Sequence, residues 1–144
     1  MKVEAMLAQK GTKVATTRPD ATVATAIRML KLEGIGALVV SGDGTEVSGI
    51  ISERDVVRGL VTHGEDLLQM HVSELMTSTV KTCGPDANIK DVMLEMTRSR
   101  IRHLPVVEDG KLAGIISIGD VVKNRLEELE TETSVLRDYI VGRS

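Results

Sequence analysis

A nine-residue segment occurs twice in the chain and constrains its fold more than any other feature. Residues 49–57 read GIISERDVV, and residues 114–122, 65 positions later, read GIISIGDVV. Segments 14–21 and 80–87 also match, as do 35–40 and 101–106, at an offset of 66 residues. A repeat of this length indicates one structural unit present twice.

Each copy begins with the same helical pattern. Asp20 and Asp86 precede it, and a carboxylate can accept hydrogen bonds from the free N–H groups of a helix start. Apolar residues then recur at i, i+3, i+4 and i+7, the spacing of one helix face, at Val23, Ala26, Ile27 and Leu30 and at Ile89, Val92, Met93 and Met96. We therefore predict a helix at the same place in both copies.

A β-hairpin is predicted after each of these helices. Asp-Gly lies between two apolar segments in both copies, at Asp43-Gly44 and at Asp109-Gly110, and this dipeptide is a strong hairpin signal. Second helices are expected over 54–61 and from Gly119 onward. The unit is thus strand, helix, strand, strand, helix, and a linker with a short helical turn joins the two units.

The C-terminal segment has a different period. Its seam residues are spaced alternately four and three apart, at Val122, Leu126, Leu129, Thr133, Leu136 and Ile140. This is a coiled-coil seam of under three heptads. Two interpretations stay open at this point: a helix that packs back on its own domain, or a contact between two copies of the chain.

Composition excludes several classes of function. No apolar run approaches the roughly 20 residues that cross a bilayer, and residues 1–5 do not resemble a signal peptide, so a cytoplasmic protein without a membrane partner is expected. The net charge of −3 and a single aromatic residue, Tyr139, argue against nucleic acid as a partner. The single cysteine, Cys83, cannot form an intrachain disulfide and is expected to be an inert thiol.

The Ser-x-x-Asp of each repeated segment is the candidate site. Ser52 with Asp55, and Ser117 with Asp120, can cap a helix. A fixed carboxylate can also accept two hydrogen bonds side by side, as the adjacent hydroxyls of a ribose require. Because a helix N-terminus favours phosphate, the doubled motif indicates a doubled nucleotide site.

The order of elements, ending in Gly-h-h-[Ser/Thr]-x-x-Asp with h apolar, resembles the cystathionine β-synthase (CBS) domain, twice over residues 10–125. The segment 100–107, RIRHLPVV, is similar to the second-copy strand of this family. The chain most resembles stand-alone bacterial CBS-pair proteins. The resemblance implies an α/β (α+β) fold of two β-α-β-β-α repeats with pseudo-two-fold symmetry, with the boundaries 10–63, 80–125, a linker 64–79 and a C-terminal helix 126–144.

The resemblance also implies adenosine-containing ligands: AMP, ADP, ATP, NAD(H) or S-adenosylmethionine. Ribose would be held by Asp55 and Asp120, with Ser52 and Ser117 beside them. The residues implied at adenine are Gly36, Ala37, His103, Leu104 and Pro105, and those implied to close the pocket are Thr16 and Thr82. Met76 and Thr77 lie where related proteins carry Met-Thr before the second copy, and we expect them to touch a ligand. Phosphate would be met by Arg54 and Arg102; for His103, phosphate contact and a satisfied strand histidine both stay open.

The two copies differ in charge near these positions. The second has Arg100, Arg102 and His103 where the first has Gly34, Gly36 and Ala37. We therefore expect two pockets with different preferences, the second binding a phosphorylated adenosine more tightly.

The leading hypothesis is a regulatory module that senses adenosine nucleotides, needs no cofactor, and forms a homodimer, a disc of four CBS units, which acts on an unidentified protein target. The alternative is a dimeric structural or interaction protein with vestigial pockets. No nucleophile–base set, phosphate loop or metal-ligand spacing is found, so neither catalysis nor a metal is expected. His63 and His71 are expected at the surface.

Overall fold

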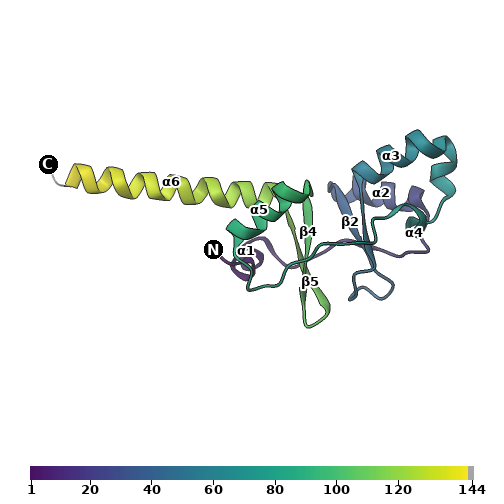
Figure 1. Ribbon diagram of the computed structural model, residues 1–144, viewed down its shortest axis with the longest axis horizontal. Coiled ribbons are helices and arrows are strands. Elements are labelled where there is room, and N and C mark those ends of the chain that lie inside the picture. The colour runs from purple at the N-terminus through teal and green to yellow at the C-terminus, as the bar shows by residue number, and fades with distance from the viewer. Residues whose placement is uncertain (143–144) are drawn as a thin grey trace.

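The computed structural model describes residues 1–142 and consists of two lobes, one for each copy, and a long helix that extends from the second lobe (Figure 1). The first lobe contains β1 (Thr16–Thr17), α2 (Val23–Glu33), β2 (Ala37–Val40), β3 (Gly49–Ser52) and α3 (Glu53–His63). The second contains α5 (Ile89–Ser99), β4 (His103–Glu108), β5 (Lys111–Ser117) and the long helix α6 (Ile118–Gly142). The remaining elements are α1 (Val3–Lys10), the 3₁₀ helix η1 (Gly64–Gln69) and α4 (Val72–Leu75). The predicted α/β fold of two repeats and a C-terminal helix is confirmed.

The sheet of the first lobe has three strands and that of the second has two, and equivalent strands pair in the same way. In the first lobe β1 pairs with β2 in parallel, and β2 pairs with β3 antiparallel, with Ala37 opposite Ser52. In the second lobe β4 pairs with β5 antiparallel, with His103 opposite Ser117. Cys83 forms an isolated parallel bridge to Val106 and so occupies the place that β1 has in the first lobe. Among the described residues no helix is both long and apolar enough to cross a bilayer.

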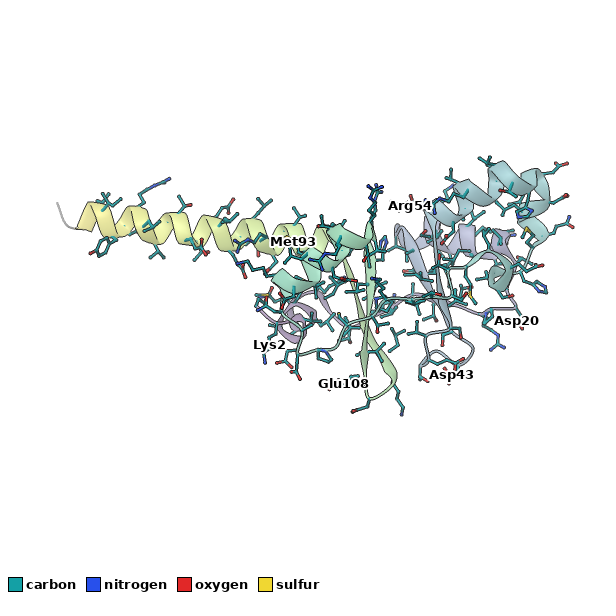
Figure 2. The ribbon with its side chains drawn as sticks, viewed as in Figure 1. Lys2, Asp20, Asp43, Arg54, Met93 and Glu108 are labelled. Carbon is teal, nitrogen blue, oxygen red and sulfur yellow. The ribbon has the colours of Figure 1, made fainter. Side chains whose placement is uncertain are left out.

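The two hairpins turn by different means, although their tips, marked by Asp43 and Glu108 in Figure 2, lie on the same side of the molecule. The second is a two-residue turn in which Asp109 (φ 52°) and Gly110 (φ 78°) both have positive φ, as a type I′ turn requires. The first is a longer loop built on Asp43, whose Oδ1 accepts hydrogen bonds from the N–H groups of Thr45 (2.8 Å) and Glu46 (2.9 Å). These bonds lower the pKa of Asp43 to about 2.

The helix starts differ from the prediction in one respect. Thr22 caps α2 by accepting a hydrogen bond from the N–H of Thr25 (3.2 Å), and Asn88 caps α5 through the N–H of Lys90 (2.9 Å). The prediction that Asp20 and Asp86 have this role is wrong. A cap must directly precede the first helical residue, and both aspartates lie two positions too early.

Each lobe has its own apolar core, and the core of the second lobe includes the N-terminal helix. Val3, Met6 and Leu7 of α1 pack with the buried faces of α5, β4, β5 and α6. The backbone fixes α1 there, because the N–H groups of Val3 and Glu4 donate to the carbonyls of Ala87 and Pro85 (both 2.9 Å). Residues that precede the first copy thus complete the second.

The linker makes the matching contact on the first lobe. Val72 of α4 lies in the core of the first lobe with Leu75 and Met76 against it, and Thr77 pairs with Ile50 of β3. The glycine that opens each repeated segment makes room for these contacts. A Cβ on Gly49 would lie 2.6 Å from the sulfur of Met76, and one on Gly114 would lie 2.7 Å from a Cδ of Leu7. Each lobe is therefore covered by the segment that enters the other copy.

Candidate functional site

A polar cavity lies between the lobes and takes its walls from both. Its volume is about 550 Å³. The first lobe contributes Gly36, Ala37, Ile50, Ser52, Glu53, Arg54, Asp55, Arg58 and Thr77. The second contributes the end of α5 and the start of β4: Ser99, Arg100, Ile101, Arg102 and His103. Eight of the predicted site residues line this one cavity.

Asp55 is held rigidly by the start of α3. Its Oδ2 accepts hydrogen bonds from the N–H (2.9 Å) and Oγ (3.1 Å) of Ser52, whose Oγ accepts one from the N–H of Asp55 (3.3 Å). This is a capping box, so the simple helix-capping explanation of Ser-x-x-Asp is correct. Oδ1 accepts a longer hydrogen bond from Thr77 Oγ1 (3.3 Å), and both residues line the cavity. The cap therefore fixes one carboxylate oxygen and leaves the other in reach of a ligand.

Four arginines give the cavity its charge. Arg54 and Arg58 come from α3, and Arg100 and Arg102 come from the segment between α5 and β4. Figure 2 shows Arg54 on the side of the molecule opposite the hairpin tips. Its Nη1 donates to the carbonyl oxygen of Arg100 (3.1 Å), which links the lobes directly. Since Glu53 and Asp55 are the acidic residues of the lining, cations outnumber anions there.

Arg100 has an unusual backbone conformation. Its φ of 56° matches that of Gly34 (φ 65°), which ends α2 at the equivalent place in the first copy. A residue other than glycine in this region costs about 1 kcal/mol or more. The second copy thus carries a strained arginine where the first has an unstrained glycine, and the result is a further cation at the cavity.

His103 narrows the cavity opposite Gly36. A Cβ on Gly36 would lie 3.2 Å from His103 Cε1 and 3.4 Å from a carboxylate oxygen of Glu53. Burial lowers the pKa of His103, and the charge of Glu53 opposes that shift in part. The ring is therefore neutral at neutral pH and can either donate or accept a hydrogen bond there.

The second Ser-x-x-Asp has the same local geometry and a different neighbour. Asp120 Oδ2 accepts from the N–H of Ser117 (2.9 Å), and Ser117 Oγ accepts from the N–H of Asp120 (3.1 Å). Lys10, the last residue of α1, donates to the same Oδ2 (2.5 Å) and to the carbonyl of Ile115 (2.9 Å). Burial raises the pKa of Asp120, but the hydrogen bonds from Lys10 and Ser117 outweigh it and hold that pKa below its ordinary value.

Space at Asp120 is limited. The cavity beside it measures about 140 Å³ and is lined by Lys10 itself and by α6 residues such as Lys123 and Glu127. Ligand pockets for molecules of nucleotide size are about 300 Å³ or larger. The second carboxylate is therefore occupied by a cation of its own chain.

The grouping of charged residues differs from the predicted one. Arg102 and His103 belong to the second copy, and we expected them in a second pocket with Asp120. They line the cavity of Asp55 instead. The physical reason is that the start of β4 faces the start of α3 across the contact between the lobes. His103 also feels the charges of Lys10 and Asp120, since it lies opposite Ser117 in the β4–β5 ladder.

The other predicted residues lie outside the cavity lining. Leu104 and Pro105 are buried in β4, Thr16 is in β1, and Thr82 is exposed. Met76 packs against Gly49. Burial raises the pKa of the Cys83 thiol to about 11, so this thiol is protonated at neutral pH. Sequence reasoning missed Arg58 and Ser99 in the lining, and it missed Lys10.

Comparison with known proteins agrees with this architecture. The CBS domain model matches residues 10–62 and again residues 72–127. The chain therefore belongs to the CBS domain family, and the resemblance read from the sequence is confirmed.

Individual relatives and structures are similar over most of the chain. The CBS domain-containing protein CBSX3, mitochondrial, of Arabidopsis thaliana is 37% identical over 127 residues, which are 85% of this chain and 62% of that protein. The chain thus spans less than two thirds of that relative. YhcV of Bacillus subtilis is 31% identical over 80% of this chain and 81% of its own length. The crystal structure of ATU1752 from Agrobacterium tumefaciens has a TM-score of 0.83 at 44% identity and covers 87% of this chain and 99% of its own.

Proposed function

We propose that this protein is a non-catalytic regulatory module that binds one phosphorylated adenosine ligand per chain, in the cavity beside Asp55. The observation that carries the proposal is the meeting of a fixed carboxylate and four arginines in one cavity of about 550 Å³. A carboxylate suits the paired hydroxyls of a ribose, and arginine forks suit phosphate. The volume lies within the range of small-molecule sites.

A structural neighbour supports the adenosine part of the proposal. The CBS domain pair of protein MJ0100 was crystallised with 5′-methylthioadenosine and S-adenosyl-L-methionine, and it shares the fold with a TM-score of 0.76 at 22% identity. The arginines of the present chain favour a more anionic ligand than either compound. We therefore rank ATP, ADP and AMP first, then NAD(H), and place S-adenosylmethionine last, because its sulfonium is cationic.

The alternative function, a scaffold with vestigial pockets, is consistent with the surroundings of the second Ser-x-x-Asp motif. Lys10 fills the place beside Asp120 that a ligand would need. Among the described residues, the Asp55 carboxylate is bound by Ser52 and Thr77 and not by a lysine, and we propose that it remains a working site. We propose that the ligand-bound state is passed to a protein target through self-association of the chain. A structural neighbour, a CBS-CP12 protein from cyanobacteria with 28% identity and a TM-score of 0.73, is described as hexameric.

Paired substitutions test the proposal. Asp55→Asn and Asp120→Asn both keep an oxygen that can accept the capping hydrogen bond and remove the charge. Isothermal titration with ATP, ADP, AMP, NAD and S-adenosylmethionine should show Asp55→Asn losing about 10- to 100-fold in affinity for the best ligand, since a charge-assisted hydrogen bond contributes roughly 1.5–3 kcal/mol. Asp120→Asn should bind like the natural protein.

Two results would contradict the proposal. One is that no compound of the panel binds or raises the melting temperature, which would favour the scaffold. The other is that both variants lose affinity equally, which would require two working sites. Release of ADP or AMP from ATP by the purified protein would contradict the non-catalytic assignment.

A further inference from the structure

The outer part of α6 lies apart from the two lobes. The helix has 25 residues and is thus roughly 37 Å long, and its buried residues, Val121 and Asn124, are in its first two turns. Beyond them Leu136 is 62% exposed and Ile140 69% exposed. Figure 1 shows the helix running away from the body. The interpretation that this helix packs back on its own domain is therefore wrong.

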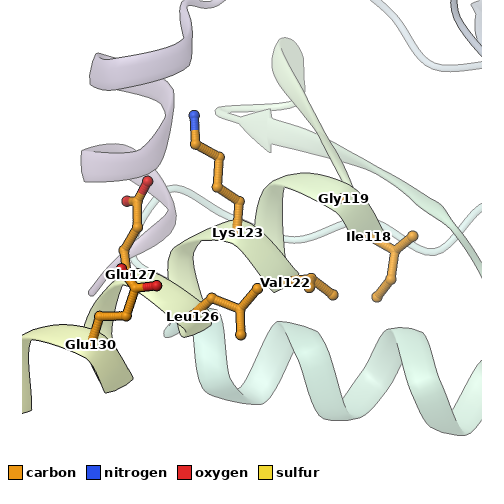
Figure 3. Close-up of a pocket in the computed structure, with 7 residues that line it drawn as sticks. All are labelled: Ile118, Gly119, Val122, Lys123, Leu126, Glu127 and Glu130. Carbon is orange, nitrogen blue, oxygen red and sulfur yellow. The ribbon is translucent and has the colours of Figure 1, made fainter. Parts of the chain in front are cut away.

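The apolar seam of α6 starts at a depression that is lined by residues of the helix itself. Ile118, Val122 and Leu126 line a depression of about 420 Å³, which Lys123, Glu127 and Glu130 border (Figure 3). The seam continues outward through Leu129, Thr133, Leu136 and Ile140. One continuous face thus runs from the second lobe along the outer part of the helix.

We propose that this face binds the same face of a second copy of the chain, as a parallel two-stranded coiled coil in register. The seam alternates two kinds of core position. One set is Val122, Leu129 and Leu136, and the other is Leu126, Thr133 and Ile140. In parallel coiled coils, leucine at the first kind of core position and β-branched residues at the second favour a two-stranded assembly. Leu129 and Leu136 follow this rule in the first set, and Thr133 and Ile140 follow it in the second.

The charges beside the seam decide the orientation. In a parallel pair, a residue on one flank meets the residue five positions later on the other flank of its partner. Arg125 then meets the partner's Glu130, and Glu132 meets the partner's Arg137. Both of these charged pairs are attractive, and the two-fold axis produces each of them twice.

The antiparallel arrangement brings like charges together. With the seams fully overlapped, residues of the same flank meet, so Glu130 would face the partner's Glu130 and Glu132 the partner's Glu132. Lys123 would face the partner's Arg137. In the single chain Arg125 pairs with Glu128 (3.1 Å), a partly exposed contact that contributes little and can rearrange on association. The geometry therefore selects the parallel pair, in which the two second lobes lie side by side.

Charge exchange tests the contact in the full chain. Sedimentation equilibrium should give a dimer of the 15.5 kDa chain. Glu132→Arg turns two attractive pairs into two repulsive pairs, and it should raise the dimer dissociation constant about tenfold or more. Glu132→Arg combined with Arg137→Glu restores opposite charges and should restore the natural constant. Asp138→Arg makes the same charge change on the outer face of the helix and should have little effect.

Disulfide trapping tests the orientation. In a Cys83→Ser background, Leu136→Cys places two thiols face to face only if the helices are parallel and in register, because a disulfide requires Cα atoms about 4.4–6.8 Å apart. Mild oxidation should yield a covalent dimer, whereas Asp138→Cys should not. Circular dichroism melts of each variant show that it is folded. A monomer at all concentrations, a dimer indifferent to Glu132→Arg, or a folded Leu136→Cys protein that does not cross-link would each overturn the proposal.

Discussion

At the scale of single residues, the two Ser-x-x-Asp motifs are alike in backbone and differ in what reaches the carboxylate. Thr77 Oγ1 donates to Asp55 at 3.3 Å, whereas Lys10 Nζ donates to Asp120 at 2.5 Å. The offset of 66 residues places Lys10 opposite Met76 and Gly11 opposite Thr77. The entering segments are therefore equivalent, and one of them carries a cation at the position where the other carries a thioether.

Removing that cation should reopen the second site. In Lys10→Ala the carboxylate of Asp120 loses its ion pair, and the small cavity beside it gains the space of the lysine atoms beyond Cβ. We expect titration with ATP to change from about one site per chain to two, the new one the weaker, because Arg102 and His103 serve the first cavity. Isothermal calorimetry gives the stoichiometry directly.

Lys13→Ala is the matched control. Lys13 is 86% exposed, and its Nζ lies 3.9 Å from a carboxylate oxygen of Glu33, so this substitution removes a positive charge at the surface. It should leave the stoichiometry at one. A stoichiometry of one in Lys10→Ala as well would show that Lys10 is not what closes the second site.

At the scale of elements, the glycine of each repeated segment has a structural role in addition to the part that the segment plays in the proposed site. Gly114 lies against Leu7 of α1, and Leu7 is buried in the core of the second lobe. The same glycine in the first copy lies against Met76. The glycines therefore allow the covering segment of each lobe to approach β3 or β5 closely.

A double-mutant cycle should reveal this contact. Leu7→Ala leaves a cavity and should lower the free energy of unfolding by about 2–5 kcal/mol. Gly114→Ala introduces a clash and should lower it by about 1–3 kcal/mol. In the double variant the added methyl enters the space that the leucine left, so the combined loss should be smaller than the sum by about 0.5–3 kcal/mol.

Urea unfolding monitored by circular dichroism measures all three variants. Leu32→Ala, at a position 84% exposed, is the control and should change stability by less than about 0.5 kcal/mol. Strictly additive losses would mean that Gly114 does not contact α1 in solution.

The elements that sequence reasoning found are those with a local signal. Both amphipathic helices, both Asp-Gly hairpins and the signature helices follow from spacing within a few residues, and the repeat confirmed each of them twice. The place of α1 carries no such signal, because Val3, Met6 and Leu7 show helical spacing but say nothing about which lobe they cover. The cavity carries no local sequence signal either, because the way the two lobes pack together decides whether Arg102 faces Asp55.

At the scale of the whole molecule, the lobes are joined by exchanged segments and by the cavity. Arg54 of the first lobe donates to the carbonyl of Arg100 in the second, and both residues line the proposed site. A ligand held on one side by Asp55 and on the other by Arg100 and Arg102 would add further bonds across the same contact. Binding should therefore stabilise both lobes.

Hydrogen exchange tests whether the ligand bridges the lobes. With saturating ATP, amide exchange should slow in residues 52–55 of the first lobe and in residues 99–103 of the second, because closing the contact raises the free energy of local opening on both sides. Asp55→Asn protein at the same ATP concentration is the control and should show little protection in either segment. Protection limited to residues 52–55 would place the ligand on the first lobe alone, and the arginines of the second lobe would then have no part in binding.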